Sequence, residues 1–283
     1  MSAGLYKPSP RPRFPLFVVA ALALIASCAR IDRPAPMLIY LLIGQSNMAG
    51  RGVIEMEDRV PHPRVFVLNQ DLAWEPGIDP LHYDKPVAGV GLGSTFGRVV
   101  ADRVPSARIG LVPAAMGGSS IDDWMPGKPL YLEAVRRARA ALKDGVLAGI
   151  LWHQGEADST EEKAAAYAEK FRRMSASFRE ELATNVVPII VGETCRERPG
   201  AATINPVLAG LADSVPFCAF VSSEGLVHRG DRTHFDSASL RELGRRYAAA
   251  WFRVASDRFQ SASDAPAANA QPSPESKRGE ESG

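Results

Sequence analysis

The side chain best placed to do chemistry is that of Ser46, in the motif G-Q-S-N-M-A-G at residues 44–50. The apolar run at residues 37–43 predicts a buried strand, so Ser46 follows the carboxyl end of that strand, where open α/β sheets bind ligands. A serine in such a turn is a nucleophile for acyl transfer if a base reaches it, and nearby backbone N–H groups can stabilise an oxyanion. The alternative is an ordinary turn between a strand and a loop.

A base for this serine has to come from one of five histidines. His234 follows Asp231 by three residues in a loop just before the last predicted helix. At this spacing the carboxylate can hold the imidazole Nδ1 and leave Nε2 facing a serine that the fold brings in. Asp236 is predicted to cap the helix. His228 is a rival base without an acid three residues upstream, and a D-x-x-H loop is common in itself.

A third polar segment, W-H-Q-G-E-A-D at residues 152–158, follows another predicted strand. Gln154 can offer an amide N–H to an oxyanion, and Glu156 is a second carboxylate that could polarise His234. The alternative is a loop that starts a helix, with Asp158 among its capping residues.

Two glycine-rich turns complete the set, at residues 89–94 and 117–124. The first leads into a predicted helix, whose free N–H groups and dipole favour negative charge. The second ends in Trp124, which could stack on a sugar or pack in the core.

Strands and helices that alternate along the chain must position these residues. The pattern predicts a parallel sheet covered by helices on both faces, an α/β fold. The predicted strands are residues 37–43, 64–68, 108–113, 148–152, 186–191 and 217–222. The predicted helices are residues 94–104, 130–142, 159–182, with Ser159 and Glu162 as a capping box, and 237–254.

The two ends of the chain differ in composition from the middle. Residues 1–28 combine a basic start with a short apolar run, which is typical of a secretory signal. We therefore predict an exported protein, with residues 29–36 as a linker, 37–255 as the folded domain and 256–283 as a disordered tail. The run I-A-S-C that ends at Cys28 resembles a bacterial lipobox, which implies lipidation of Cys28 and a membrane anchor; a plain secretory signal is the alternative.

Composition excludes several classes of protein. With 283 residues, a net charge of +1 and three cysteines, the chain gives no sign of a nucleic-acid groove, a polybasic membrane patch or a disulfide scaffold. Cys195 and Cys218 do not form a close-spaced metal motif with histidines; they could pair, or both could be buried thiols. Met48 stands where the G-x-S-x-G elbow needs glycine, so the α/β-hydrolase signature is absent.

Taken together, the motifs resemble the SGNH-type hydrolases, and within them the sialate O-acetylesterase and acetylxylan esterase branch. The family fold is a three-layer α/β/α sandwich with a flavodoxin-like central parallel sheet. The matching motifs are G-Q-S-N-M-A-G at 44–50, G-L-G-S-T-F at 91–96, G-G-S-S-I-D-D-W at 117–124, H-Q-G-E at 153–156 and D-R-T-H-F at 231–235.

The resemblance implies a role for each matching residue. Ser46 corresponds to the nucleophile, His234 to the base and Asp231 to the acid partner, with Glu156 as the alternative acid. The Ser46 amide, Gly93 and Gln154 correspond to the oxyanion hole. Most SGNH enzymes have asparagine where this branch has Gln154, so the reach of that donor is open. The candidate substrate contacts are Gln45, Asn47, Gly118 and Trp124.

The activity implied is removal of O-acetyl groups from a carbohydrate through an acetyl-serine intermediate, without a metal or cofactor. Acetylxylan, O-acetyl sialic acid and other acetylated glycans stay open as substrates. One alternative is a non-catalytic carbohydrate-binding protein on the same fold, which would predict loss of a catalytic residue. The other is an esterase for non-sugar esters, which would predict an apolar lid near the motifs.

Overall fold

The computed structural model describes residues 36–263, and Pro36 begins a compact unit that contains the five motifs between residues 44 and 235. The predicted signal segment with Cys28, and the linker up to residue 35, lie outside the described residues. In the described part of the chain, seven strands form one sheet in the order β3-β2-β4-β1-β5-β6-β7. The strands are β1 Met37–Gly44, β2 Val65–Leu68, β3 Trp74–Pro76, β4 Arg108–Pro113, β5 Gly145–His153, β6 Ile189–Gly192 and β7 Cys218–Val221.

The sheet has the expected flavodoxin-like centre. Strands β4-β1-β5-β6-β7 are parallel and follow the flavodoxin order, and β2 and β3 extend the sheet beyond β4. Only the short β3, which the sequence did not predict, runs antiparallel. The chain order reverses between β1 and β5, so the loops after these two strands leave toward opposite faces. This is the point at which open α/β sheets form binding crevices.

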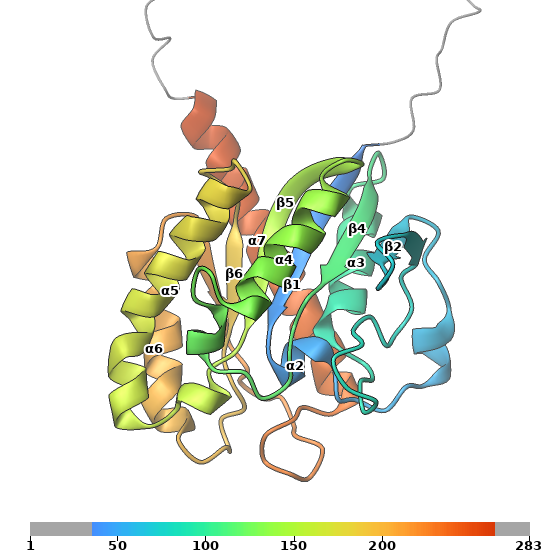
Figure 1. The fold of residues 1–283 in the computed structure, drawn as a ribbon. Coiled ribbons are helices and arrows are strands. Elements are labelled where there is room, and N and C mark those ends of the chain that lie inside the picture. The colour runs from blue at the N-terminus through green and yellow to red at the C-terminus, as the bar shows by residue number, and fades with distance from the viewer. Residues whose placement is uncertain (1–35, 264–283) are drawn as a thin grey trace, which may run out of the picture. The chain divides into compact units, whose positions relative to one another are not determined.

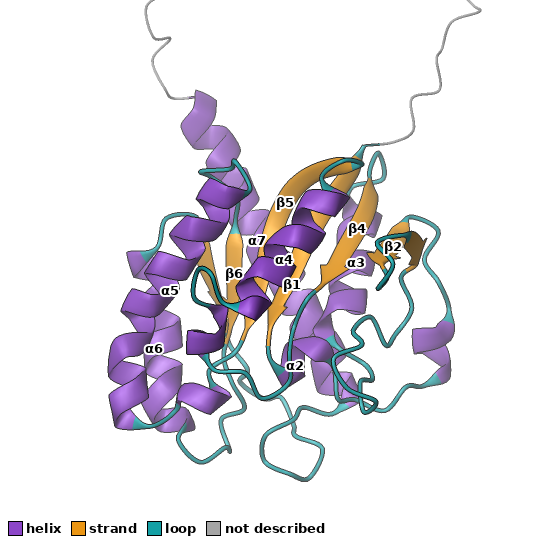
Figure 2. Ribbon diagram, viewed as in Figure 1, coloured by secondary structure: helices purple, strands orange, loops and turns teal. Residues whose placement is uncertain are grey.

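Helices cover both faces of the sheet, which confirms the predicted three-layer α/β/α sandwich (Figures 1 and 2). They are α2 Ser46–Ala49, α3 Leu92–Arg103, α4 Pro129–Ala141, α5 Glu161–Glu181, α6 Ala201–Ser214 and α7 Ser237–Ser263, with 3-10 turns η1 Met56–Arg59, η2 Ile121–Trp124 and η3 Glu156–Asp158. In Figure 1, α4 and α5 lie in front of the sheet, while α3 and α7 lie behind it.

Side chains of β1 alternate between the two layers. Ile39, Leu41 and Ile43 pack in the core under α4, α5 and α6, whereas Tyr40 and Leu42 pack in the core under α3 and α7. All five are buried, because a parallel sheet with both faces covered has no solvent side. The apolar run in the sequence therefore reflects two separate cores that share one strand.

Some helix boundaries differ from the prediction. Thr160, not Ser159, caps α5, and its hydroxyl accepts the Lys163 N–H at 3.4 Å. The predicted last helix, residues 237–254, is too short, because α7 continues to Ser263, into the predicted tail; residues 264–283 lie outside the described part. The sequence missed α6, which carries Pro206 in its interior. Asp236 caps α7 as expected, since its Oδ1 accepts the Ser239 N–H at 2.7 Å.

The turn after β1 explains why Ser46 lies at the reversal point of the sheet. Gly44 has φ +126°, and a Cβ at this position would lie 2.2 Å from the carbonyl oxygen of His153. The next residue, Gln45, donates its N–H to that same oxygen at 2.9 Å. Only glycine allows β1 to turn this closely against the end of β5. The turn brings Ser46 to the first position of α2, at the lower end of β1 in Figure 1.

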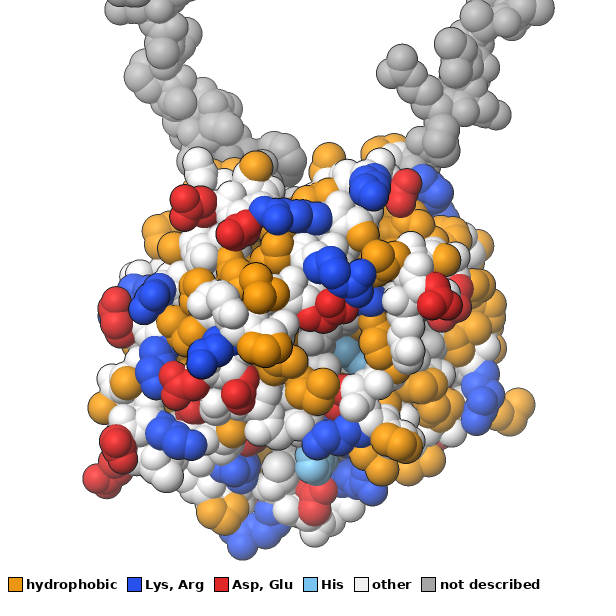
Figure 3. Space-filling model, viewed as in Figure 1, with side chains coloured by type: hydrophobic (Ala, Val, Ile, Leu, Met, Phe, Trp, Pro, Cys, Tyr) orange, Lys and Arg blue, Asp and Glu red, His pale blue; other side chains and the backbone are white. Residues whose placement is uncertain are grey.

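On the face seen in Figure 3, basic and acidic side chains are interspersed, without an extended surface of either charge. Among the helices of the described residues, none is long and apolar enough to cross a membrane.

Candidate active site

Ser46, His234 and Asp231 form one hydrogen-bonded chain, although Ser46 is far from the other two in the sequence. The Nε2 of His234 lies 2.9 Å from the Oγ of Ser46, and its Nδ1 lies 2.7 Å from an Oδ of Asp231. Ser46 comes from the turn after β1, and the other two from the loop before α7. A nucleophile, a base and an acid that orients the base are therefore in place for acyl transfer.

Asp231 is held as an anion within its own loop. Partial burial raises its pKa, but hydrogen bonds from the N–H and the ring of His234 and from the N–H of Thr233 outweigh burial and lower the pKa to about 2. The two backbone bonds measure 2.8 Å from His234 and 3.0 Å from Thr233. The carboxylate is thus oriented by its own loop before it meets the imidazole.

Glu156, the alternative acid, does not bond to His234. It is buried, and its Oε1 accepts a hydrogen bond from Asn47 Nδ2 at 2.7 Å. Burial raises its pKa above the usual value, and the hydrogen bonds that it accepts oppose this only in part. The geometry therefore pairs His234 with Asp231 rather than with Glu156.

A hollow of about 420 Å³ opens at Ser46 and His234. Gly118 borders it, exposed to solvent and with φ +87°. The backbone N–H groups of Ser46 and Gly118 have no acceptor among the described residues. Two unpaired N–H donors thus border the same hollow as the nucleophile.

A buried ion pair holds the turn that contains Gly118. Arg51 Nη2 lies 2.6 Å from Asp84, and the same carboxylate accepts the Gly117 N–H at 2.9 Å. Burial raises the pKa of Asp84, but the bonds from Arg51 and Gly117 outweigh it, so the pKa lies below its usual value. This pair was not predictable from the sequence, because Arg51 and Asp84 lie in two loops without regular spacing.

Two residues predicted as oxyanion donors, Gly93 and Gln154, do not line the hollow at Ser46. Gly93 is inside α3, where a Cβ would lie 2.3 Å from Leu42 and 3.0 Å from Leu81, so this glycine serves close packing of α3 on the sheet. Gln154 is fully buried, and its Nε2 donates to Asp158 at 2.6 Å and to the carbonyl of Ser119 at 3.1 Å. The bonds of the Gln154 amide contradict its predicted role, and Gly93 is not among the residues that line the hollow.

Two predicted substrate contacts are also buried inside the protein. Trp124 is fully buried, packs edge-on against Trp152 at 5.6 Å between ring centroids, and donates its Nε1–H to Ser119. It is a core residue, not a stacking face for a sugar. Asn47 is also fully buried, and both ends of its amide are hydrogen bonded within the protein.

The other two candidate contacts, Gln45 and Gly118, line the hollow. The Oε1 of Gln45 accepts from Gln154 Nε2 at 3.2 Å, and its own Nε2 has no acceptor among the described residues. Gln45 therefore keeps a hydrogen-bond donor available at the hollow.

The remaining histidines have other partners or are buried. His228, the rival base, contacts Glu197 at 3.2 Å. His153 is fully buried beside Tyr247, and burial lowers its pKa to about 3, which keeps it neutral. Cys195 and Cys218 are both free thiols, so they do not pair. In the described range, no cluster of three or more His, Cys, Asp or Glu side chains could hold a metal ion.

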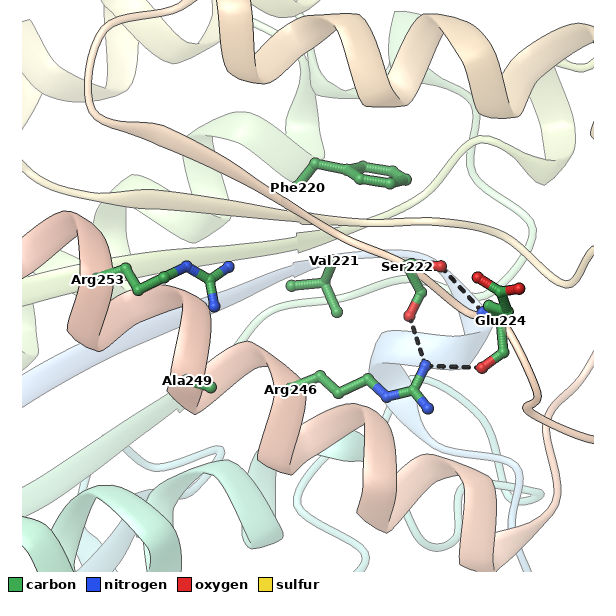
Figure 4. A pocket seen from close by; sticks show the side chains of 7 residues that line it. All are labelled: Phe220, Val221, Ser222, Glu224, Arg246, Ala249 and Arg253. Carbon is green, nitrogen blue, oxygen red and sulfur yellow. Dashed lines mark hydrogen bonds between the residues drawn. The ribbon is translucent and has the colours of Figure 1, made fainter.

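A second hollow, of about 590 Å³, lies between β7 and α7 (Figure 4). Arg246 crosses it and donates to the carbonyl oxygens of Ser222 and Glu224, both at 2.9 Å. No histidine lines this hollow, and the Ser222 hydroxyl is bonded to Glu193 at 3.0 Å. It therefore lacks the base that the hollow at Ser46 has.

Residues 36–253 match the sequence profile of the family described as "Carbohydrate esterase, sialic acid-specific acetylesterase". The chain belongs to this family. It is a carbohydrate esterase, and the expected likeness to the SGNH carbohydrate esterases is confirmed.

Among the relatives of this carbohydrate esterase is the "Probable carbohydrate esterase At4g34215" of Arabidopsis thaliana. It is 33% identical over 230 residues, which cover 74% of this chain and 88% of the relative. The crystal structure of that plant protein superposes with a TM-score of 0.72, at 31% identity, over 78% of this chain and 99% of the other.

Two more distant structures share the fold. NanS matches with a TM-score of 0.66 at 20% identity, over 81% of this chain and 100% of its own. XAC1771, a carbohydrate acetylesterase from Xanthomonas citri, matches with a TM-score of 0.60 at 18% identity, over 78% of this chain and 57% of its own.

Proposed function

We propose that this carbohydrate esterase is an exported serine enzyme that removes O-acetyl groups from a glycan through an acetyl-serine intermediate. The observation that carries the proposal is the chain of contacts from Ser46 Oγ through His234 to Asp231, at 2.9 and 2.7 Å. A non-catalytic binding protein on this fold would have no need to keep these three side chains hydrogen bonded to one another.

In the proposed mechanism, His234 Nε2 takes the proton of Ser46 as Oγ attacks the acetyl carbonyl carbon. The tetrahedral intermediate collapses, and the imidazolium gives its proton to the departing sugar oxygen. Water, deprotonated by His234, then attacks the acetyl-serine, and the imidazolium returns the proton to Ser46 Oγ as acetate is released. Asp231, with a pKa of about 2 despite its partial burial, stays ionised and supports the imidazolium at each step.

The oxyanion would be held by backbone amides. The N–H groups of Ser46 and Gly118 border the hollow without an acceptor among the described residues, which supports them as the donors. Gln45 Nε2 is a third donor that is free at the same hollow. Donors that are fixed before the reaction stabilise the developing charge at little reorganisation cost.

Charge at the rim favours an anionic sugar among the candidate substrates. Lys85 lines the hollow, and its ammonium has no partner among the described residues. Arg198 also lines it, bonded to the Ser159 hydroxyl at 2.8 Å and to the Pro199 carbonyl at 2.9 Å but to no described carboxylate. Two cations without a carboxylate partner suit an acetylated sugar that carries its own carboxylate.

Release of acetate from p-nitrophenyl acetate, acetylated xylan and O-acetylated sialic acid, with wild type and Ser46→Ala side by side, tests the proposal. We expect Ser46→Ala to abolish all three activities. We also expect Lys85→Ala and Arg198→Ala to raise KM for the sialic acid substrate only. Activity that survives Ser46→Ala would disprove the nucleophile.

The outcomes separate the alternative functions as well. A folded protein that binds acetylated glycans but releases no acetate would be a binding module. Activity on p-nitrophenyl acetate and simple esters, with none on either glycan, would identify an esterase for non-sugar substrates.

Export rests on the sequence of the amino-terminal segment. Production of the full chain in a bacterium with labelled palmitate, beside Cys28→Ser, tests both export and lipidation. Label on wild type alone supports the lipoprotein; an unlabelled protein in the periplasm or medium supports a plain secretory signal. Retention of the full-length chain in the cytoplasm would refute export.

A further inference from the structure

Asn47, the residue after Ser46, is bonded to the backbone on both sides of His234. Its Oδ1 accepts the Phe235 N–H at 3.1 Å, and its Nδ2 donates to the Thr233 carbonyl at 3.0 Å. Asn47 is fully buried. The side-chain amide of Asn47, next to the proposed nucleophile, is therefore hydrogen bonded to the residues immediately before and after the proposed base.

A third contact fixes the orientation of that amide. Asn47 Nδ2 also donates to Glu156 Oε1 at 2.7 Å, and Glu156 is itself buried in the turn after β5. The Glu156 oxygen accepts from the NH₂ end of Asn47, so it reinforces the orientation that the Thr233 carbonyl and the Phe235 N–H also require. The three segments that carry Ser46, Glu156 and His234 thus meet at one side chain.

The loop that carries His234 depends on such contacts. It contains two residues with positive φ, Gly230 at +107° and Arg232 at +57°, and its own acid Asp231 is exposed. Phe235 is also buried in the core, where it packs edge-on against His153, and Arg229 donates to the Arg51 carbonyl at 2.6 Å. Asn47 adds the side-chain hydrogen bonds that hold the backbone at Thr233 and Phe235. Buried hydrogen bonds at the flanks are costly to lose, because water cannot replace them.

We propose that Asn47, whose orientation Glu156 reinforces, is the positioning residue for His234. It holds the backbone on both sides of the imidazole and so keeps Nε2 within hydrogen-bond reach of Ser46. This rests on the proposed function, in which His234 is the base. Asn47 itself touches neither the substrate nor the reacting atoms.

The test is a set of variants assayed for kcat and KM on p-nitrophenyl acetate. Asn47→Ala is expected to lower kcat about 10- to 100-fold, the usual effect of a misplaced catalytic group, with KM changed less than about threefold. Glu156→Gln is expected to keep most of the activity, because the new amide oxygen can still accept from Asn47 Nδ2.

A swapped pair makes the test specific for orientation. Asn47→Asp keeps an acceptor for the Phe235 N–H, but it removes the donor to the Thr233 carbonyl and sets two carboxyl groups against each other. The second substitution, Glu156→Gln, can remove only the repulsion between the carboxyl groups. In the double variant Asn47→Asp/Glu156→Gln, the introduced amide can donate to the introduced carboxylate. We expect kcat of the double variant to recover about tenfold over Asn47→Asp alone. A defect in folding alone predicts equal kcat per folded molecule in the two variants.

Asn205 is a matched control. It is buried in α6, and its Oδ1 accepts the Thr194 hydroxyl at 2.7 Å and the Thr194 N–H at 3.2 Å, so Asn205→Ala also removes buried hydrogen bonds. We expect Asn205→Ala to lower the free energy of unfolding with kcat unchanged.

Failure of the positioning role can be distinguished from failure of the proposed function. An Asn47→Ala variant that loses stability as Asn205→Ala does but keeps wild-type kcat would overturn the positioning role. If Asn47→Ala does not fold, the near-isosteric Asn47→Asp and the double variant test the positioning role instead. Equal kcat in these two variants would overturn that role. Activity retained in Ser46→Ala would instead defeat the proposed function itself.

Discussion

The two carboxyl groups near His234 are in different environments. Asp231 is partly exposed and receives hydrogen bonds that lower its pKa to about 2 against the effect of burial. Glu156 is buried, and burial raises its pKa. A carboxylate that stays ionised and touches Nδ1 suits the acid partner. A buried carboxyl whose side-chain hydrogen bond goes to Asn47 rather than to His234 suits a structural role.

Substitution of each carboxyl by its amide separates these roles. Asp231→Asn is expected to lower kcat about 10²- to 10³-fold, because the amide no longer holds the imidazole in the required tautomer. Glu156→Gln is expected to cost less than about tenfold, because its contact to Asn47 survives. Steady-state kinetics on p-nitrophenyl acetate measures both. The reverse order of effects would make Glu156 the acid partner.

Single residues also show where sequence interpretation stops. Ser46, His234 and Asp231 were found because each follows a predicted strand or precedes a predicted helix at the same sheet edge. Trp124 and Gln154 occupy the predicted segments too, but their side chains point into the core. Sequence places a residue at a strand end; it does not give the direction of a side chain within an irregular loop, which tertiary packing decides.

At the scale of elements, the turn between β1 and α2 positions the nucleophile. Gly44 has φ +126°, and any Cβ there would collide with the His153 backbone. The contact joins the ends of β1 and β5, the two strands at which the chain order reverses. The position of Ser46 therefore depends on a glycine two residues earlier that touches no substrate.

Alanine at this glycine tests that dependence. Gly44→Ala is expected to lower the free energy of unfolding by about 2 kcal/mol or more and to reduce kcat, because the backbone must shift where Ser46 begins α2. Gly210 in α6 is the control, since nothing lies within 4 Å of an added Cβ. We expect Gly210→Ala to stabilise by about 0.5–1 kcal/mol. Denaturant unfolding measures both; equal effects would contradict this role of Gly44.

Elements with a regular apolar pattern were predictable from the sequence, but α6, which a proline interrupts, was not. The strands before Ser46 and Gln154 are apolar on both faces, and α5 repeats apolar residues at helical spacing, so their patterns are strong. The helix α6 has Gly200 as its N-cap, without a side-chain hydrogen bond, and carries Pro206 inside; both features are typical of loops. Packing on β7 and α5 stabilises it despite these local signals.

For the molecule as a whole, stability depends on pH through a buried carboxyl group. Burial raises the pKa of Asp79 from 3.8 to about 7, even though Ser94 and the Gly91 N–H donate to it. Between these two values the folded protein holds a proton that the unfolded chain has released. Stability therefore falls as pH rises from about 4 to about 7.

The variant Asp79→Asn tests this pH dependence. The amide can still accept from Ser94 but carries no charge at any pH, so the penalty for ionisation disappears. We expect the free energy of unfolding of the variant, relative to wild type, to rise by up to about 4 kcal/mol as pH goes from 4 to 7. Urea unfolding at a series of pH values measures it. A constant difference between the two proteins would mean that Asp79 is ionised throughout.

The active site is also a property of the whole molecule, because its three segments come together only in the folded sheet. The central claim is that Ser46, activated by His234, is the nucleophile. Reaction with diethyl p-nitrophenyl phosphate, followed by mass spectrometry of the peptides, tests it most directly. The account predicts one diethylphosphoryl group on Ser46, absent in Ser46→Ala and formed far more slowly in His234→Ala. Modification of another residue, or an undiminished rate in His234→Ala, would contradict it.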